Sequence, residues 1–290
     1  MTSDATQLLG AHVSTSGGVA TAPPRGVAIG ATAIQLFTKT PNQWREPTVT
    51  PEIAQAFNEA LAQSGLQAVV AHDSYLINLA SPDQALRQRS IGSFVAELTR
   101  CRMLGIPYVV SHPGNYIDDR DAGLKRNAAG YADALTAVPG DVMVLLEGTA
   151  GSGTALGRTF DELAELRALI PEALRHRVAY CLDTCHLYSS GYDLVNDFDG
   201  VFDQFDQRCG LDRLRVVHLN DSKTPFASHR DRHELIAEGS LGAEPFRRLM
   251  TDARFAQVIK LLETPKGDDA VTNDRRMLRR LRSYARVAAR

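Results

Sequence analysis

The chain has 290 residues, of which 44% are hydrophobic, and a formal net charge of −2. This length and apolar content suffice for one large core, which a single α/β barrel or two ordinary domains could supply. The near-neutral charge gives no support to a nucleic-acid partner, because proteins that bind polyanions are often basic. Any such function must depend on local charge.

The four cysteines and the N-terminus indicate a reducing compartment. Cys101, Cys181, Cys185 and Cys209 include no C-x-x-C pair and are too few for a disulfide framework in a chain of this length. Met1–Gln7 lacks the basic and apolar regions of a signal peptide, and no apolar run is long enough to span a membrane. We therefore expect a cytoplasmic protein with no membrane partner.

Eight short apolar runs recur along the chain, and a stretch with helical spacing follows each. The runs are continuously apolar rather than alternating, which is typical of parallel strands covered on both faces. The predicted strands are Leu8–Ser14, Thr32–Thr38, Ala68–Asp73, Tyr108–His112, Val142–Glu147, Val178–Asp183, Leu214–Asn220 and Val258–Glu263.

The segments between these runs are predicted to be amphipathic helices. One apolar face carries Ile91, Phe94, Val95 and Leu98, and another carries Leu124, Ala128, Tyr131 and Leu135. Thr50-Pro51 and Ser81-Pro82 each offer a capping side chain followed by proline in the first helical turn. Eight strand–helix units predict an α/β fold, a (β/α)8 TIM barrel with residues 1–290 as one domain. A doubly wound open sheet is the alternative.

Ionisable side chains gather where the predicted strands end, and barrels of this kind build their active sites at that end. The residues are His72, His112, Glu147, Asp183, His186, His218 and Glu263, with Asp231 and His233 in the loop after the seventh strand. A single histidine or glutamate there is ordinarily structural. This set, however, brings five of the eight histidines and four carboxylates to one barrel mouth. Burial of so many ionisable groups is costly without counter-charge, and divalent metal ions ordinarily supply it.

The donor types narrow the choice of metal. Imidazole with carboxylate suits zinc, and also manganese or iron, whereas no thiolate belongs to the set. Nine donors exceed the need of one tetrahedral site and, with Glu147 bridging, fill two or three sites that each keep a position open for water or substrate. Three divalent ions against four carboxylates leave about two positive charges. Such a site favours an anionic substrate such as phosphate.

The remaining histidines and two cysteines near this set receive other interpretations. We expect His12 to be structural or to support a ligand, and His176 and His229 to lie at the surface. Cys181 and Cys185 flank a ligand-bearing strand end, but buried inert thiols are common, so we do not expect them to bind metal.

Short motifs run through nearly the whole chain, from Leu9 to about Thr264. They are Gly10-Ala-His-Val-Ser14, Phe37-Thr-Lys39, His72-Asp-Ser-Tyr-Leu-Ile-Asn-Leu79, His112-Pro-Gly114, Glu147 with Thr149-Ala-Gly151, Asp183-Thr-Cys-His186, Gly191-Tyr-Asp193, His218-Leu-Asn-Asp221, Asp231-Arg-His233, Glu238-Gly239 and Leu262-Glu-Thr264. In this order they resemble the endonuclease IV family of apurinic/apyrimidinic endonucleases, which act in DNA repair.

The resemblance implies a trinuclear zinc site. One zinc would be held by His72, His112 and Glu147, the second by Glu147, Asp183, His218 and Glu263, and the third by His186, Asp231 and His233. It also implies cleavage of double-stranded DNA on the 5′ side of an abasic site, which leaves a 3′-hydroxyl, and trimming of blocked 3′ ends. A hydroxide that bridges two zincs would attack the phosphorus, with Glu147 and Glu263 as the catalytic residues that fix the metals and orient it.

The same resemblance implies DNA contacts from loops beside the site. Tyr75 and Leu76 match the wedge that the family inserts into the minor groove at the lesion, although the residues alone are equally compatible with core positions. Lys39, Asn42 and Gln43 lie in a second candidate DNA-binding loop, after the second predicted strand.

This chain departs locally from the family pattern. Asn42 stands where many relatives carry arginine, and Gly148 replaces the asparagine that commonly follows the bridging glutamate. Ala237 stands where glycine is usual, and His229-Arg230 replaces a basic-then-apolar pair. None of these positions is an expected metal ligand, so they bear on DNA affinity and lesion preference rather than on the reaction class.

Two other functions fit parts of the pattern. Glu147, Asp183, His218 and Glu263 alone would suit a metal-dependent sugar isomerase or epimerase, which would not require the other five residues. A non-catalytic binder of damaged DNA could keep zinc for structure, but structural zinc sites are usually closed and rich in cysteine.

The arginine-rich C-terminal segment is predicted to be the eighth barrel helix rather than a DNA-binding tail. Met277, Leu281, Tyr284 and Ala288 recur at helical spacing and leave a basic outer face. Such a helix starts near the catalytic mouth, so we expect Arg275 and Arg276 to reach DNA phosphate and Arg286 and Arg290 to be solvated. We expect a monomer.

Overall fold

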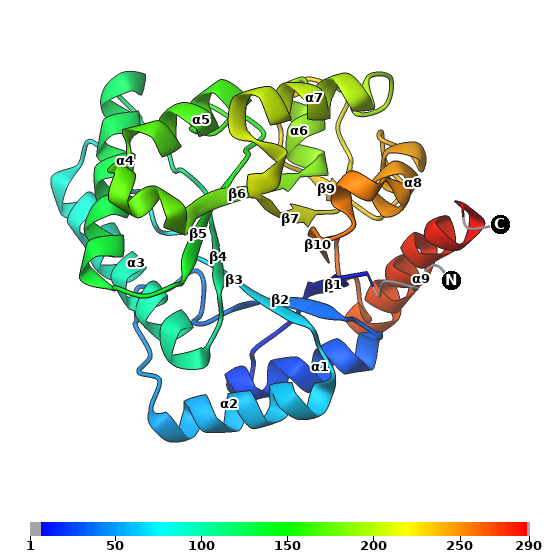
Figure 1. Ribbon diagram of the computed structural model, residues 1–290, viewed down its shortest axis with the longest axis horizontal. Coiled ribbons are helices and arrows are strands. Elements are labelled where there is room, and N and C mark those ends of the chain that lie inside the picture. The colour runs from blue at the N-terminus through cyan, green and yellow to red at the C-terminus, as the bar shows by residue number, and fades with distance from the viewer. Residues whose placement is uncertain (1–6, 289–290) are drawn as a thin grey trace.

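In the computed structural model, eight parallel strands form a closed barrel with helices around it (Figure 1). The structure describes residues 7–288, and side chains as far as residue 285. The barrel strands are β1 (Leu9–His12), β2 (Ala33–Phe37), β3 (Ala68–His72), β4 (Tyr108–Ser111), β5 (Met143–Glu147), β6 (Val178–Asp183), β7 (Leu214–His218) and β10 (Ile259–Leu262). Pairing of β1 with both β2 and β10 closes the barrel, which excludes the doubly wound open sheet.

All eight predicted strands are present, and several are shorter than predicted at their C-terminal ends. The run Leu8–Ser14 forms a strand only over Leu9–His12, and the run Leu214–Asn220 only over Leu214–His218. There the backbone leaves the ladder and turns into a loop. The polar residues that close each run therefore lie at or just beyond one rim of the barrel.

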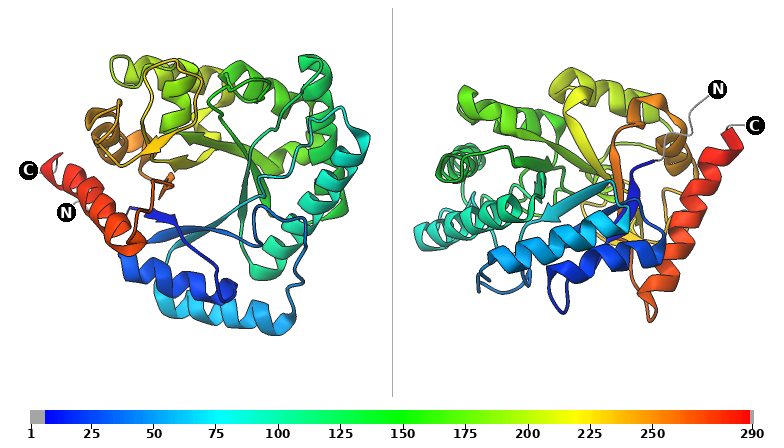
Figure 2. Two further views of the ribbon diagram at one scale, coloured as in Figure 1. Left: turned by 180° about the vertical axis from the view of Figure 1, so that it is seen from behind. Right: turned by 60° about the horizontal axis from the view of Figure 1, so that its bottom comes forward.

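Helices follow the strands and cover the outside of the barrel, as the two further views in Figure 2 show. The α-helices are α1 (Ala22–Ile29), α2 (Pro51–Ser64), α3 (Gln84–Leu104), α4 (Arg120–Ala137), α5 (Phe160–Leu169), α6 (Thr184–Ser190), α7 (Phe198–Cys209), α8 (Glu244–Thr251) and α9 (Ala270–Ala288). Short 3₁₀ helices are η1 (Val19–Thr21), η2 (Glu172–Arg177), η3 (Leu211–Arg213) and η4 (Ala253–Phe255). A small hairpin, β8 (Asp221–Ser222) with β9 (His233–Glu234), rises from the loop after β7.

One of the two predicted helix starts is confirmed and the other is wrong. Thr50 caps α2, because its side chain accepts a hydrogen bond from the backbone N–H of Ile53. Helix α3 begins two residues later than Ser81-Pro82 indicates. Its cap is Asp83, whose carboxylate accepts from the N–H of Leu86, while the Ser81 hydroxyl accepts from the N–H of Asp83.

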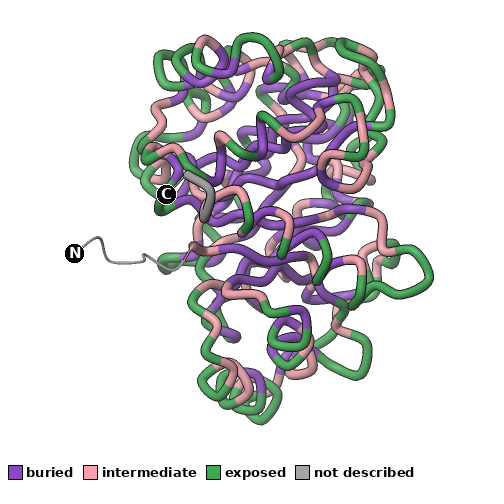
Figure 3. Tube along the Cα trace, turned by 90° about the vertical axis from the view of Figure 1, so that its right-hand side faces the viewer, coloured by how far each residue is buried: buried purple, intermediate pink, exposed green. Residues whose placement is uncertain are grey.

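The strands are buried along their lengths, as the tube in Figure 3 shows. Alternate residues such as Val70, Val110 and Leu145 fill the barrel interior. The residues between them, such as Val69 and Val109, join the larger core that packs against the helices. A filled interior leaves only the rims for a reactive pocket.

The prediction of a C-terminal barrel helix is confirmed. Met277, Leu278 and Leu281 of α9 are fully buried, and α9 packs against α1 and α8. The expectations for Arg286 and Arg290 concern side chains outside the described residues. Within residues 7–288, no helix is both long and apolar enough to cross a membrane.

Candidate metal centre

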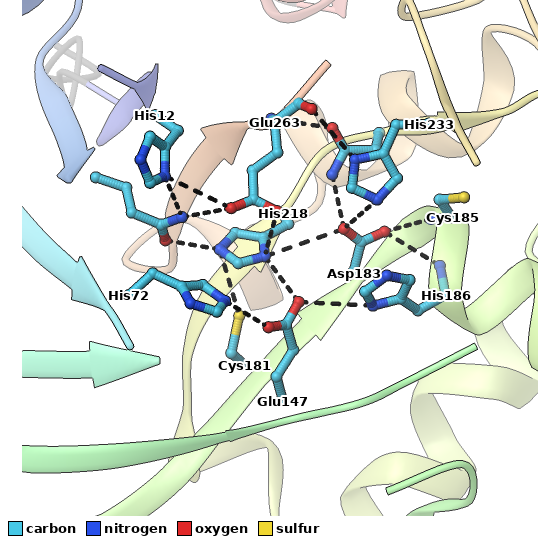
Figure 4. Close-up of polar contacts among 12 residues, drawn as sticks. His12, His72, Glu147, Cys181, Asp183, Cys185, His186, His218, His233 and Glu263 are labelled. Atoms are coloured by element: carbon cyan, nitrogen blue, oxygen red, sulfur yellow. Dashed lines mark hydrogen bonds and ion pairs between the residues drawn. The ribbon is translucent and has the colours of Figure 1, made fainter. Parts of the chain in front are cut away.

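The structure brings all nine residues of the predicted metal site to one rim of the barrel. His72, Glu147, Asp183 and His218 are the last residues of β3, β5, β6 and β7. His112 and Glu263 directly follow β4 and β10, His186 lies in the first turn of α6, and Asp231 and His233 come from the hairpin. Figure 4 shows the side chains of His72, Glu147, Asp183, His186, His218, His233 and Glu263 pointing toward one another.

Glu147 is the centre of the arrangement. Its carboxylate is fully buried, and its Oε2 atom lies 3.1 Å from Nε2 of His72 and 2.9 Å from Nε2 of His112. Its Oε1 atom lies 2.9 Å from Nδ1 of His218 and 3.6 Å from Nδ1 of His186. One carboxylate thus faces imidazoles on two sides, as a bridging ligand would.

A second group surrounds His218. Besides Glu147, its Nδ1 atom lies 3.3 Å from Oε2 of Glu263 and 4.0 Å from Oδ2 of Asp183. Strand register explains part of this proximity, because Asp183 and His218 are paired residues of β6 and β7. Both are fully buried.

A third group lies nearer to solvent. Oxygens of the Asp231 carboxylate lie 3.2 Å from Nε2 of His186 and 3.1 Å from Nε2 of His233. Nε2 of His233 also lies 3.5 Å from Oδ2 of Asp183. The Asp231 side chain is 48% exposed, so this group faces the open side of the pocket.

Backbone carbonyls fix the orientation of three of the imidazole rings. Nδ1 of His72 donates to the carbonyl of Asp73 at 3.0 Å, and Nδ1 of His186 donates to the carbonyl of Gly148 at 2.9 Å. Nδ1 of His233 donates to the carbonyl of Glu263 at 3.2 Å. Each ring therefore points Nε2 into the pocket, and in the neutral ring that nitrogen carries the lone pair. Such bonds are the usual device for orienting a histidine ligand.

The donor set fits a multinuclear metal site. Ligand atoms of His72, His112 and Glu147 all lie within 4.8 Å of one another, and the same holds for Glu147, Asp183, His218 and Glu263. Nε2 of His186 and Nε2 of His233 are buried and have no partner with hydrogen-bond geometry, although Asp231 is near both. Buried polar atoms rarely lack a partner, so two nitrogens aimed into one pocket indicate a cation site.

The charges in the pocket favour bound cations. Burial alone lowers the pKa of His72, but its hydrogen bond to Glu147 and the nearby carboxylates outweigh burial and raise that pKa to about 10. Asp183 and Asp231 likewise outweigh burial and raise the pKa of His233 to about 9. Burial raises the pKa of Glu147, yet His112 and His218 hold it well below its usual range. The carboxylates thus stay ionised and favour positive charge on the imidazoles, which protons supply without metal and metal ions would supply in their place.

Two buried cysteines, which we did not expect to bind metal, lie near the site. The Cys181 thiol lies near Glu147 and His218, and the Cys185 thiol near Asp231 and His233. Burial raises the pKa of Cys181 to about 12 and that of Cys185 to about 11. Burial thus favours the thiol form of both side chains in the metal-free protein, and that neither binds metal stays a prediction.

Two residues that organise the site were not predicted as members of it. Asn220 donates from Nδ2 to Oδ2 of Asp183 at 2.6 Å, and its Oδ1 accepts from the N–H of Glu263 at 3.0 Å. Gln35 lies in the middle of β2 and contacts His218 and Glu263. The available signal for Gln35 was a single polar residue within the apolar run Ala33–Phe37.

A pocket of about 410 Å³ opens above these groups. Its walls include His12, Phe37, Tyr75 and Lys266 in addition to candidate ligands. His12 supports Glu263 from one side, with 3.8 Å between Nδ1 and Oε1. The pocket is large enough for a sugar and a phosphate, and most of the residues that line it have polar side chains.

The residues expected to contact DNA differ in their exposure. Tyr75 is 70% exposed and packs edge-on against Phe37, with 5.3 Å between ring centroids, so it is not a core residue. Leu76 is half-buried, and Asn42 and Gln43 are exposed.

Lys39 is placed differently, because its side chain is buried. Its ammonium donates to Glu46 at 2.6 Å and to Ser93 at 3.0 Å. In this conformation it offers no free charge to a phosphate.

Other expectations meet mixed outcomes. His176 is exposed as expected, but His229 is half-buried, because its N–H donates to the carbonyl of Ser189 and its carbonyl accepts from the Ser152 hydroxyl. His229 thus lies at the surface with part of its side chain covered, and it ties the loop before Asp231 to the loop after β5.

The arginines at the start of α9 have partners within the protein. Nε of Arg275 donates to the carbonyl of Ala28 at 2.5 Å, and Arg276 pairs with Glu238 at 2.6 Å. Contact with a DNA phosphate would have to compete with these interactions.

Comparison with known proteins identifies the family. A family model described as the xylose isomerase-like TIM barrel matches residues 25–282. A probable endonuclease 4 of Geobacter sulfurreducens is 47% identical over 265 residues, which cover 90% of this chain and 89% of that protein. A crystal structure of endonuclease IV from Thermus thermophilus superposes with a TM-score of 0.86 at 36% identity, covering 96% of this chain and 99% of that one.

A more distant neighbour shares the fold alone. The D-psicose 3-epimerase of Clostridium cellulolyticum superposes with a TM-score of 0.62 at 13% identity, covering 97% of this chain and 96% of that one. This similarity shows that the two proteins share the barrel fold, and it does not support sugar chemistry in this chain. With nearly half of its residues identical to a relative over most of its length, the chain belongs to the endonuclease IV family of apurinic/apyrimidinic DNA-repair endonucleases.

Proposed function

We propose that this chain hydrolyses double-stranded DNA on the 5′ side of an abasic nucleotide, leaves a 3′-hydroxyl and trims blocked 3′ ends, with three zinc ions at the barrel mouth. The observation that carries the proposal is the sharing of the buried Glu147 carboxylate between two donor groups, beside a third group around Asp231. Such a cluster suits a phosphodiester, whose negative charge it would neutralise.

The metal assignment follows the three groups. His72, His112 and Glu147 would hold the first zinc, and Glu147, Asp183, His218 and Glu263 the second. His186, Asp231 and His233 would hold the third. When bound, the zinc ions would acidify a water molecule and neutralise charge on the phosphate and the leaving oxygen. Manganese or iron suits the same imidazole and carboxylate donors.

The chain's own residues would position the reactants. Glu263 is held by Gln35 at Oε1, so its Oε2 faces His218 and the centre of the cluster. From there Glu263 would orient the attacking water, and Glu147 would keep two donor groups at a fixed separation. Backbone carbonyls hold three of the five histidine rings, so these rings need little reorganisation when the phosphate arrives.

Lesion recognition would come from the rim of the pocket. Tyr75 is exposed beside His72, on a chain segment that packs against Phe37. An apolar side chain there would fill the gap left by a missing base and allow the abasic sugar to rotate into the pocket. Intact DNA offers no such gap, so the same contact would contribute selectivity.

The test is incision of a 5′-labelled duplex with one abasic-site analogue by zinc-loaded protein. We expect a product that a DNA polymerase extends, which requires a 3′-hydroxyl. We expect Glu263→Gln, which keeps volume and removes charge, to lose most of this activity, and Glu97→Gln, a buried carboxylate outside the pocket, to retain it. Cleavage on the 3′ side of the lesion, full activity in metal-free protein or turnover of a keto-sugar instead would overturn the proposal.

A further inference from the structure

Gln35 is a buried amide that contacts the side chains of candidate metal ligands from two different strands. It lies in the middle of β2 and is fully buried. Its Oε1 atom accepts a hydrogen bond from Nε2 of His218 at 2.8 Å. Its Nε2 atom donates to Oε1 of Glu263 at 2.5 Å and lies 3.0 Å from Nδ1 of His12. Gln35 has no exposed surface, and the candidate ligands Glu263 and His218 lie between it and the pocket centre or beside it.

The barrel register makes this arrangement possible. His12 and Gln35 are paired residues of β1 and β2, and β1 also pairs with β10, which Glu263 follows. Gln35 therefore reaches Glu263 across β1. His218 comes from β7, on the far side of β10. A single side chain thus connects residues from four neighbouring strands at the floor of the site.

The chemistry of the contacts fixes the orientation of the amide. Its two N–H groups have two acceptors, Glu263 and His12, and its oxygen has one donor, Nε2–H of His218. If the amide were reversed, its oxygen would face the Glu263 carboxylate, and two acceptors at that distance repel. The Glu263 carboxylate therefore decides which end of Gln35 faces His218.

This orientation determines which atoms remain free to bind metal. With its proton on Nε2, neutral His218 carries its lone pair on Nδ1, which faces Glu147 at 2.9 Å and Glu263 at 3.3 Å. Because Gln35 bonds Oε1 of Glu263, the other carboxylate oxygen, Oε2, is free to face Nδ1 of His218. The sulfur of Cys181, 3.8 Å from Nε2 of His218, is too weak an acceptor to replace the amide oxygen.

We infer that Gln35 is a positioning residue that holds His218 and Glu263 in the geometry required by the metal ion between Glu147 and Asp183. The inference rests on the proposed metal site. Partners of this kind orient a ligand histidine and raise its basicity, and their removal typically lowers metal affinity by about 10- to 100-fold. Glutamate could not serve, because it would set a second carboxylate against Glu263. An apolar residue would remove the amide hydrogen bonds to Nε2 of His218 and Oε1 of Glu263.

The test compares zinc retention in the wild-type protein, Gln35→Met and Gln55→Met. Methionine matches the length of glutamine but makes no hydrogen bond, and Gln55 is an exposed glutamine on α2 that bonds Glu59. Zinc content is measured after purification, and zinc release is followed with a chromogenic chelator. We expect one zinc per chain to leave Gln35→Met about 10- to 100-fold faster than the wild type, with Gln55→Met unchanged.

A double-mutant cycle on zinc release separates positioning from a general structural role. If Gln35 acts through Glu263 and His218, Gln35→Met adds little to the effect of Glu263→Gln, because the two changes remove parts of one unit. Full additivity, or lowered thermal stability of the metal-free protein with unchanged zinc release, would overturn the inference. Should Gln35→Met fail to fold, Gln35→Asn keeps the amide on a shorter side chain, and we expect the same faster release.

Failure of this inference is distinguishable from failure of the proposed function. A wild-type chain that retains no zinc at these residues contradicts the metal site itself. A wild-type chain that retains zinc, together with a Gln35→Met chain that retains it equally well, contradicts only the role of Gln35.

Discussion

Oε1 of Glu147 lies 2.9 Å from Nδ1 of His218, although the two residues end strands that are separated by β6. In a flat sheet, residues two strands apart stand roughly 10 Å from each other. The curvature of the barrel turns both side chains inward and removes most of that distance. Glu147 can therefore contact His218 on one side and His72 on the other, and the site depends on closure of the barrel.

The bridging position of Glu147 predicts that Glu147→Gln lowers zinc content and incision activity more than any single histidine substitution does. An amide has the size of the carboxylate but cannot neutralise two cations, so we expect loss of at least two zinc ions per chain. We expect incision of abasic duplex to fall on the order of 10²- to 10³-fold or more. Zinc content by atomic absorption and single-turnover incision check both results.

Glu97→Gln is the matched control for Glu147→Gln, because Glu97 is equally buried and pairs with Arg100 away from the pocket. We expect this control to lower the melting temperature and to keep its zinc. A Glu147→Gln protein with full zinc content would contradict the bridging role.

The metal-free protein is expected to lose stability as the pH rises above neutrality. The pKa of His72 is raised from 6.5 to about 10, and that of His233 from 6.5 to about 9. A group whose pKa is higher in the folded state stabilises fully below its unfolded pKa, and that contribution disappears as the pH rises through the folded value. The melting temperature without metal should therefore fall between about pH 6.5 and 10.

Bound zinc should reverse this dependence. Metal binds the deprotonated imidazoles, so zinc competes with protons and its stabilisation grows over the same pH window. Thermal melts from pH 6 to 9.5, with chelator or with zinc, provide the measurement. Parallel curves in the two conditions would show that these histidines do not bind zinc.

Tyr75 is expected to distinguish damaged from intact DNA. Its side chain is 70% exposed and contacts Phe37 rather than the interior of the protein. We expect Tyr75→Ala to weaken binding to abasic duplex by about 10-fold or more, from the loss of roughly 1–3 kcal/mol of stacking, and to leave intact duplex nearly unaffected. Fluorescence anisotropy with both duplexes measures the two affinities.

Ile117 supplies the control for Tyr75. It is an apolar residue, 62% exposed, in a different loop after β4. We expect Ile117→Ala to change the two affinities equally or not at all. Equal losses on both duplexes for Tyr75→Ala would mean that Tyr75 supports the protein surface instead of reading the lesion.

The sequence predicted the barrel and the candidate ligands for the same reason. Parallel strands covered on both faces are continuously apolar, so a charged residue such as Glu147 or Asp183 at the end of a run is conspicuous. Because all such ends meet at one rim, residues far apart in sequence could be assigned to one site without knowledge of any distance. The helix start at Asp83 was missed because Ser81-Pro82 offers the same local signal two residues earlier.

Positioning residues were harder to predict, because their role depends on register. Gln35 acts only through the alignment of β1, β2 and β10, which the hydrophobic pattern does not determine.

The burial of the Lys39 side chain could not be predicted from the sequence either. A lysine just beyond a strand end indicates an exposed cation, but a carboxylate seven residues later folds back onto it. Long-range contacts of this kind decide which charges remain available to a ligand.

Lys39 is therefore expected to organise the loop after β2 rather than to bind a DNA phosphate. Its ammonium bonds Glu46, whose other oxygen bonds Arg100, and Arg100 in turn bonds Glu97 of the same helix. This chain of buried charges ties the loop that carries Asn42 to α3. Loss of one charged hydrogen-bonding partner from such a network costs on the order of 2 kcal/mol.

We expect Lys39→Met to lower the melting temperature by several degrees, as a loss of about 2 kcal/mol does in a domain of this size, and to weaken DNA binding only modestly. The decisive measurement is affinity against salt concentration. A phosphate contact contributes about one unit to the slope of log affinity against log salt, because each neutralised phosphate releases a condensed cation. For Lys39→Met we expect an unchanged slope, since the Lys39 charge is already paired with Glu46.

Arg45→Gln is the control, because it changes an exposed cation of the same loop. We expect it to flatten the slope by about one unit without lowering stability. A flatter slope for Lys39→Met with an unchanged melting temperature would instead show that Lys39 leaves Glu46 to bind the phosphate when DNA arrives.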